Sequence, residues 1–149
     1  MYSCSMEDVR IEKAKQEDWP YIKEKLKNYI LDPTDASWEK FFVAKIKDKT
    51  VGFGRIIDHG EYFELASVGV DYYHRKKGIG KKILFFIRDE AKRQDSKKPI
   101  YGVTPWPDFL KIAGFVEVEK GPEELEYKIN NSECVLHPER TKILKLKEA

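Results

Sequence analysis

Hydrophobic and polar positions along the chain follow two different periods, which predicts a domain that contains both strands and helices. Short runs rich in β-branched and aromatic residues, bounded by turn-forming residues, indicate strands. The predicted strands are residues 9–14, 41–46, 51–57, 62–70, 100–103, 115–119 and 126–129. Apolar positions at helical spacing predict helices that begin at residues 18–20 and occupy residues 79–93 and 108–113, with a short helical piece around Trp38.

Length and composition set broad limits. The chain of 149 residues is long enough for one domain with a sizeable core, and its 41% hydrophobic and 36% charged residues are typical of a globular protein. The net charge of +2 is too small to indicate a partner. No apolar run approaches the length of a membrane span, and residues 1–6 lack the features of a signal peptide. We therefore expect a cytoplasmic protein with no membrane partner.

The cysteines and histidines do not predict a metal site. Cys4 and Cys134 are far apart, and the histidines His59, His74 and His137 are scattered along the chain. Zinc sites usually combine two closely spaced pairs of ligands, whereas Cys134 and His137 form a single pair. No metal is expected.

The most informative chemistry lies in residues 75–80, Arg-Lys-Lys-Gly-Ile-Gly, between the predicted strand 62–70 and the predicted helix 79–93. Glycine lets the backbone approach a ligand closely, and the N–H groups at a helix N-terminus favour an anion. The basic residues of the segment, with Lys81 and Lys82, add positive charge. The segment therefore predicts a site for a phosphate or pyrophosphate, and it matches neither the P-loop nor the dinucleotide-binding pattern.

The pattern Arg75-x-x-Gly78-x-Gly80, preceded by residues 70–74, resembles the coenzyme A signature of the GCN5-related N-acetyltransferases, the GNAT family. The resemblance implies that acetyl-CoA is the co-substrate. The cofactor-binding residues that it implies are Val68, Gly69, Val70, Arg75, Lys76, Lys77, Gly78, Ile79, Gly80 and Lys81.

The resemblance covers about residues 9–130, and the predicted elements follow the family's order. It implies an α/β (α+β) fold in which a mixed central sheet of six to seven strands is flanked by helices. It places a GNAT domain at residues 7–131, followed by a basic C-terminal extension at residues 132–149. We interpret residues 138–149 as a basic tail or short helix with no assigned role.

Two residues of the predicted strand 62–70 match catalytic positions of the family. A backbone N–H there stabilises the thioester oxygen, and the matching residue is Val68; Gly69 beside it indicates a bulge or a close ligand approach. Glu64, fourteen residues before Gly78, matches the catalytic glutamate of the histone-modifying branch. We expect Glu64 to act as the base or to bind the acceptor's ammonium group, with Glu61 as the nearby alternative.

Residues 109–115, Phe-Leu-Lys-Ile-Ala-Gly-Phe, resemble a second family segment, in which a helix ends at a glycine and a strand follows. The family's tyrosine, which is proposed to protonate the leaving thiolate, falls on Leu110, and a leucine cannot donate a proton. Water, Tyr101, Tyr127 or Cys134 are the alternatives, and the sequence does not choose among them.

These observations predict an N-acetyltransferase that moves an acetyl group from acetyl-CoA to a primary amine, by direct attack in a ternary complex. The acceptor is a small molecule or a peptide amine of unidentified type. A non-catalytic acyl-CoA-binding or regulatory module is the alternative function. We expect no nucleic-acid partner, because the basic residues coincide with the predicted pyrophosphate site. A homodimer is left open.

Overall fold

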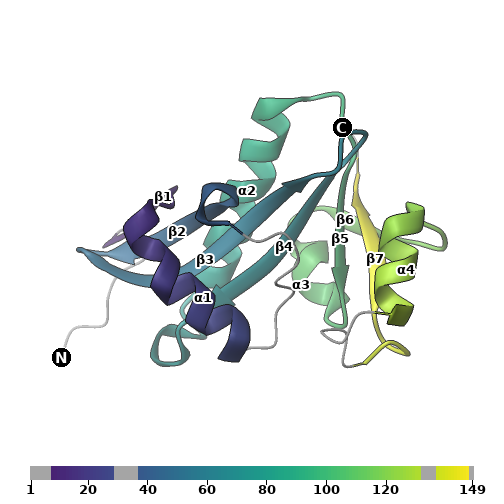
Figure 1. Cartoon of the computed structure of the whole chain (residues 1–149). Helices are drawn as coiled ribbons and strands as arrows, with labels where there is room; N and C mark the ends of the chain where they lie inside the picture. The colour runs from purple at the N-terminus through teal and green to yellow at the C-terminus, as the bar shows by residue number, and fades with distance from the viewer. Residues whose placement is uncertain (1–7, 29–36, 132–136, 148–149) are drawn as a thin grey trace.

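The computed structural model describes residues 8–28, 37–131 and 137–147 of the chain (Figure 1). The strands are β1 (Val9–Lys13), β2 (Phe41–Ile46), β3 (Lys49–Asp58), β4 (Phe63–Val70), β5 (Ile100–Thr104), β6 (Phe115–Val118) and β7 (Lys142–Leu146). The α-helices are α1 (Trp19–Asn28), α2 (Ile79–Gln94), α3 (Pro107–Ile112) and α4 (Glu123–Asn131). Short 3-10 turns occupy Gln16–Asp18, Trp38–Lys40 and Tyr72–His74.

The described strands form one mixed sheet of seven strands in the order β1-β2-β3-β4-β5-β7-β6. Neighbours β4 and β5 are parallel, and every other neighbouring pair is antiparallel. This confirms the predicted fold class. The first six predicted strands and the predicted helices are present with small shifts at their ends, and the short piece at Trp38 is a 3-10 turn.

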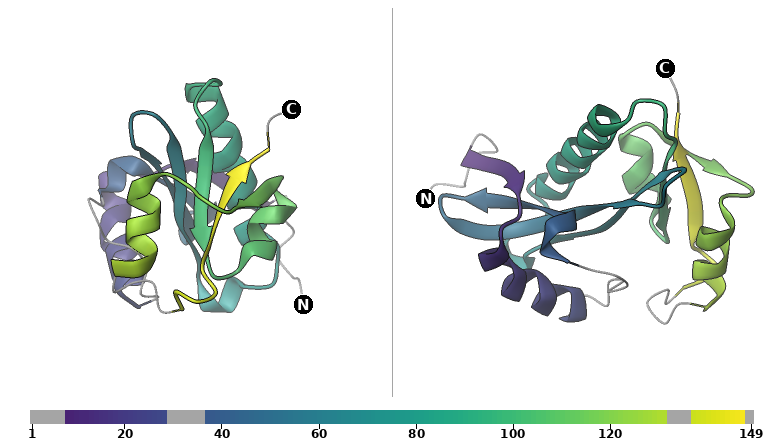
Figure 2. Two further views of the ribbon diagram at one scale, coloured as in Figure 1. Left: turned by 90° about the vertical axis from the view of Figure 1, so that its right-hand side faces the viewer. Right: turned by 45° about the horizontal axis from the view of Figure 1, so that its top comes forward.

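Helices cover both faces of the sheet. The first core cluster lies under α2 and α3, where Ile83 and Leu110 pack against strand residues such as Leu65. On the opposite face, α1 covers β2 and β3, and α4 covers the far strands through a smaller cluster around Leu125. Figure 2 (left) shows α1 and α4 on one side of the sheet and α3 on the other. On this face of the sheet, β4 therefore lies between the strands that α1 covers and the strands that α4 covers.

The sequence explains why α2 forms where it does. Its buried residues recur at helical spacing along one face of the helix, which packs on the sheet. These residues are Ile79, Ile83, Leu84, Ile87 and Ala91. Lys92 and Arg93 lie in the last turn, where positive charge is favourable. Among the described residues, neither α2 nor another helix combines the length and the apolar character that crossing a membrane requires.

The strand predicted at residues 126–129 is wrong, because this segment lies inside α4. Leu125 is buried, and Ile129, one helical turn later, packs against the same cluster. Glu123 and Glu124 occupy the first turn, where negative charge is favourable. Apolar positions four residues apart define a helix face, and a four-residue window was too short to show it.

The interpretation of residues 138–149 as a tail or short helix is also wrong. Lys142–Leu146 forms β7, which lies between β5 and β6 in the sheet. Ile143 and Leu144 are both buried, because the two faces of the sheet are each covered by a helix. The sheet thus extends past residue 131, where the predicted domain ends.

Candidate active site

A β-bulge interrupts β4 near the predicted thioester site. Gly54 of β3 lies opposite two residues of β4, Ser67 and Val68, and Ser67 has a positive φ of 56°. The extra residue bends the strand locally. Gly69 is not the bulge; it makes room for Phe53, since a β-carbon at Gly69 would lie 2.6 Å from Cζ of Phe53.

Strands β4 and β5 are paired over only three residues and then separate. The last pair in their register is Leu65 with Gly102. Past this point β4 pairs only with β3, and β5 only with β7 (Figure 1). Within the described chain, residues 66–70 have no strand partner on the β5 side. Main-chain groups along this edge, which includes Val68, are therefore placed to bind an extended ligand.

An exposed turn connects this open edge to α2. Tyr72–His74 forms a single 3-10 turn, and the exposed residues 75–78 follow. Two residues have left-handed backbone, Lys76 with φ 63° and Gly78 with φ 80°. Gly78 is the N-cap of α2, so the turn leads directly into the helix. The N–H groups at the start of α2 thus face a segment that is open to solvent, as an anion site requires.

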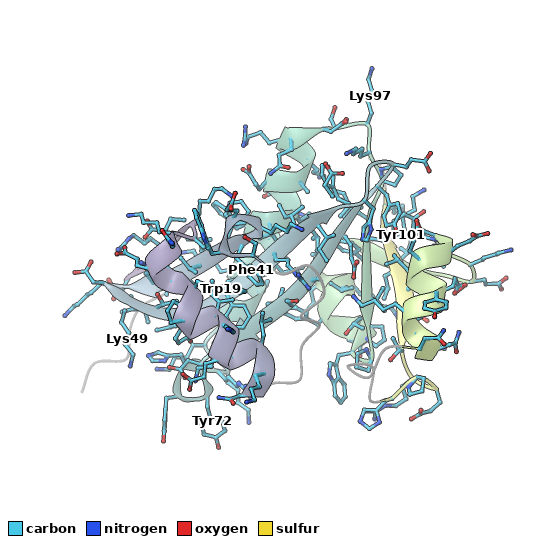
Figure 3. All side chains as sticks on the ribbon, in the orientation of Figure 1. Trp19, Phe41, Lys49, Tyr72, Lys97 and Tyr101 are labelled. Atoms are coloured by element: carbon cyan, nitrogen blue, oxygen red, sulfur yellow. The ribbon has the colours of Figure 1, made fainter. Side chains whose placement is uncertain are left out.

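The basic side chains at this turn lie in different directions. Nε of Arg75 donates to the carbonyl of Val70 at 3.0 Å, and its guanidinium lies 5.7 Å from the ring centroid of Tyr72. Figure 3 shows Tyr72 projecting outward from this turn. Lys82 instead donates to the carbonyl of Val9 in β1. The charge of Lys82 is therefore directed to the edge of the sheet and not to the predicted anion site.

The first turn of α2 is anchored on one side and open on the other. Ile79 is buried in the core, Gly80 is half-buried and Lys81 is exposed. A β-carbon at Gly80 would meet only ordinary contacts, the nearest being Cγ2 of Val70 at 3.6 Å. Nζ of Lys81 lies 5.6 Å from the ring centroid of Phe85. The predicted residues 75–81 are thus brought together around one helix N-terminus.

Glu64 is a buried carboxylate held between two basic side chains, and it is 2% exposed. Its Oε1 lies 2.9 Å from Nε2 of His59, and its Oε2 accepts a hydrogen bond from Nζ of Lys128 at 2.8 Å. Burial alone would raise the pKa of Glu64, but the hydrogen bond from His59 and the charge and hydrogen bond of Lys128 outweigh it and lower that pKa. Glu64 is therefore ionised at neutral pH, and Nε2 of His59 carries the shared proton. The alternative residue Glu61 lies in an exposed turn.

This arrangement belongs to a known family. A family model described as "Acetyltransferase (GNAT) domain" matches residues 37–117, which is more than half of the chain. The chain belongs to the GNAT acetyltransferase family. The resemblance found at residues 75–80 is thereby confirmed. A comparison with curated proteins gives no match.

Solved GNAT-like structures share the fold at low sequence identity. Rv2747 from Mycobacterium tuberculosis, crystallised with CoA and NLQ, is 22% identical with a TM-score of 0.73, and the match covers 94% of this chain and 99% of that one. IAA acetyltransferase from Bacillus cereus is 18% identical with a TM-score of 0.66, covering 94% and 99%. N-acetylglutamate synthase from Neisseria gonorrhoeae, complexed with coenzyme A and N-acetyl-glutamate, is 17% identical with a TM-score of 0.71. That match covers 93% of this chain but 34% of the synthase, so the chain spans about a third of the synthase's length.

The GNAT tyrosine position is filled here by a core residue. Leu110 is buried in the cluster under α2 and α3. Its Cδ1 would lie 2.5 Å from a β-carbon at Gly102, so the leucine packs directly on the backbone of β5. Of the alternative proton donors, Tyr127 is 69% exposed, and Cys134 lies outside the described residues. Tyr101 is half-buried on β5, beside α4 (Figure 3).

Aromatic rings pack around the Glu64 cluster of this GNAT domain. The ring of Tyr62 stacks on His59 with centroids 4.5 Å apart, and it meets the ring of Tyr101 edge-on at 5.5 Å. Its hydroxyl donates to Oε2 of Glu124 at 3.3 Å. Burial, reinforced by the charge of Glu124, raises the pKa of Tyr62, so this hydroxyl stays protonated at physiological pH. The described residues hold no group of three or more His, Cys, Asp or Glu side chains that could bind a metal ion.

Sequence reasoning did not find the two partners of Glu64. His59 was considered only as a metal ligand, and Lys128 was assigned to a strand. Lys128 lies 64 residues after Glu64, and a contact between such distant residues leaves no local pattern. The one available signal was helical: Leu125 and Ile129 define the buried face of α4, and Lys128 lies beside it.

Proposed function

We propose that this GNAT protein transfers the acetyl group of acetyl-CoA to a primary amine by direct attack in a ternary complex. The observation that carries the proposal is the separation of β4 from β5 beside the exposed, glycine-capped N-terminus of α2. The separated strands offer main-chain groups to an extended thiol arm, and the helix N-terminus offers N–H groups to a diphosphate. Coenzyme A carries both parts in one molecule. Two of the similar structures were crystallised with it.

The proposed reaction needs a group that stabilises negative charge on the thioester oxygen. The amine nitrogen forms a bond to the carbonyl carbon, and the carbonyl oxygen takes the negative charge. The carbon–sulfur bond then breaks, and coenzyme A leaves as a thiolate. We assign the stabilising N–H to Val68, which lies at the bulge on the open edge of β4. The nitrogen, positively charged after it has formed the new bond, loses its remaining extra proton to solvent as the amide forms. Water protonates the thiolate in this scheme, because Leu110 has no proton to give.

Glu64 suits an acceptor that arrives as an ammonium ion. An ionised, buried carboxylate attracts such a group strongly, because water does not screen the interaction. The lowered pKa of Glu64 makes it a weaker base than an ordinary glutamate. The anchoring role is therefore favoured over the role of base. The proton of the ammonium passes to Glu64 or to solvent before attack.

The acceptor class to test first is a small amino acid. The gonococcal synthase structure contains N-acetyl-glutamate, the acetylated form of an amino acid. This chain is far shorter than that synthase, so the synthase's own substrate does not transfer directly. Protein lysines, N-terminal amines and polyamines are the other acceptors to include.

Two measurements test the proposal with the full chain. Calorimetry with acetyl-CoA measures binding, and a thiol reagent measures release of coenzyme A over a panel of amino acids, polyamines and peptide amines. We expect binding, together with thiol release that depends on one class of amine. Absence of acetyl-CoA binding would overturn the assignment of the open β4 edge and the α2 N-terminus as its site.

One observation favours the second candidate, a non-catalytic acyl-CoA-binding module. Both oxygens of Glu64 are engaged by His59 and Lys128, and Leu110 is committed to the core. Acetyl-CoA binding without thiol release for any amine of the panel would support this candidate over the enzyme.

A further inference from the structure

Lys128 places a primary alkylammonium group on the carboxylate of Glu64. The N–O distance is 2.8 Å, and the two side chains are 19% and 3% exposed. The lysine comes from α4, which lies between β6 and β7 in the sequence, and the glutamate comes from the middle of the sheet. The contact therefore joins the helix to the strand that carries the predicted site.

The chemical identity of this group matters. An acceptor of an N-acetyltransferase carries a primary amine, which is an ammonium ion at neutral pH, and the end of the Lys128 side chain is the same group. His59 already binds the other oxygen of Glu64. Because Glu64 is 2% exposed, an incoming ammonium has no open approach to the carboxylate while Lys128 is in place.

We propose that Lys128 is an internal ammonium group that occupies the acceptor position on Glu64 and must swing away before an acceptor binds. The inference rests on the proposed function, specifically on Glu64 as the anchor of the acceptor. It makes Lys128 a gating residue that lowers the affinity of every ammonium acceptor. Lys128 thereby selects acceptors whose ammonium group binds Glu64 strongly enough to displace it.

The structure allows this movement without unfolding α4. The buried anchor of the helix is Leu125, which packs with Tyr62 and Ile143 on the sheet. Lys128 lies one turn away from that anchor, and a lysine side chain is long and flexible. Its ammonium can leave Glu64 by rotation of the side chain, while the apolar contact of Leu125 holds the helix in place.

A purely structural tie is the competing explanation, and it predicts different kinetics. Lys128→Met keeps the length of the side chain and removes its charge. If Lys128 occupies the acceptor position, the variant lowers the KM of the acceptor and leaves the KM of acetyl-CoA unchanged; a site that is open about a tenth of the time gains about tenfold in affinity. If Lys128 only ties α4 to the sheet, the acceptor KM stays the same or rises.

Three further variants make the kinetic test specific. Lys145→Met is the matched control, because Lys145 lies in register with Tyr101 on the same sheet and its ammonium is over that ring, 6.0 Å from the centroid. It should leave the acceptor KM unchanged. Lys128→Arg should retain the wild-type KM, because the positive charge stays. In a Glu64→Gln background, Lys128→Met should no longer lower the acceptor KM.

A binding measurement decides the question without turnover. The side-chain ammonium of Lys128 in the ¹⁵N-labelled wild-type protein is followed by NMR while n-butylammonium is added. Displacement from Glu64, seen as a saturable change or loss of this signal that is absent in Glu64→Gln, supports the proposal. An unchanged signal at saturating n-butylammonium overturns it. If the protein binds acetyl-CoA but transfers nothing, the proposed function fails and this titration still reports on Lys128.

Discussion

The side chain of Leu110 occupies the space in which a β-carbon at Gly102 would lie, with Cδ1 only 2.5 Å from that point. The position at which the family carries a tyrosine is therefore closed by the backbone of β5 in this chain. A glycine on the strand and a leucine on α3 are matched in size. This contact explains why α3 can pack close to the sheet at the point where β4 and β5 separate.

The first prediction is that Leu110→Tyr destabilises the protein and does not improve catalysis. The larger ring has no room above Gly102, and overpacking of a core costs about 1–3 kcal/mol. Urea unfolding measures this loss, with Leu110→Met as the control of similar volume. A rate gain with unchanged stability would show that the space between α3 and β5 accepts the tyrosine and that acid assistance limits the wild-type protein.

The second prediction is that Gly78→Val abolishes acetyl-CoA binding while the protein stays folded. The residue has φ 80°, a conformation that costs about 1–2 kcal/mol for a residue with a β-carbon. Gly60→Val is the matched control, because Gly60 has φ 94° and lies in a turn with no atom near a β-carbon. Both variants should lose similar stability, and only Gly78→Val should lose calorimetric binding. Equal affinity in the two variants would remove the anion site from this turn.

The anion turn could be predicted from sequence because its requirements are local. The positive φ at Gly78 and the start of α2 directly after it are both encoded within the six residues 75–80. The same holds for α2, whose buried face repeats at helical spacing. The bulge at Ser67 and Val68 was harder to predict, because it depends on how β4 pairs with β3. The sequence suggested Gly69, the residue that directly follows it.

Other features depend on contacts between distant segments, and sequence reasoning failed there. β7 has basic residues between its apolar ones, and it is a strand because β5 and β6 lie on either side of it. The ion pair of Glu64 with Lys128 and the contact of Leu110 with Gly102 are likewise set by packing. The basic residues of 138–149 suggested an exposed tail. Ile143 and Leu144 are buried, however, and their packing in the core makes this segment a strand.

The third prediction follows from the place of β7 inside the sheet. Leu144 is fully buried, so Leu144→Ala should lower the free energy of unfolding by about 2–5 kcal/mol. Lys142→Ala, on the same strand at an exposed position, should change it by less than about 0.5 kcal/mol. Thermal or urea unfolding compares the two. If neither substitution changes the free energy of unfolding, β7 does not contribute to the core of the sheet.

The fourth prediction separates cofactor binding from turnover at Glu64. Glu64→Gln should bind acetyl-CoA as the wild type does and lower kcat/KM for the acceptor, because a neutral amide holds an ammonium ion less strongly than a carboxylate does. A fall of roughly 10²-fold or more in kcat would instead be typical of loss of a general base. Calorimetry and thiol release measure the two properties. Glu61→Gln is the control, because Glu61 lies in an exposed turn. Loss of turnover in the control alone would move the role to Glu61.

The last prediction concerns acid stability. The pKa of Glu64 is lowered in the folded protein from its ordinary value of 4.5, because the hydrogen bonds and charges of His59 and Lys128 outweigh the effect of burial. A lowered folded pKa means that the unfolded chain binds the proton more readily. The carboxylate therefore contributes stability above pH 4.5, and this contribution is lost as the pH falls through the folded pKa.

Comparison of the wild type with Glu64→Gln isolates this contribution. Urea unfolding between about pH 7 and pH 3 should show the two curves converging below pH 4.5, since the glutamine variant has no carboxylate to protonate. Three other ion pairs each include an exposed side chain and contribute little to the pH dependence of stability. They are Arg93 with Glu90, Lys111 with Glu117, and Lys98 with Asp58. Parallel curves over the whole range would mean that the ion pairs of Glu64 do not favour its ionised form, and the anchor role would lose its electrostatic basis.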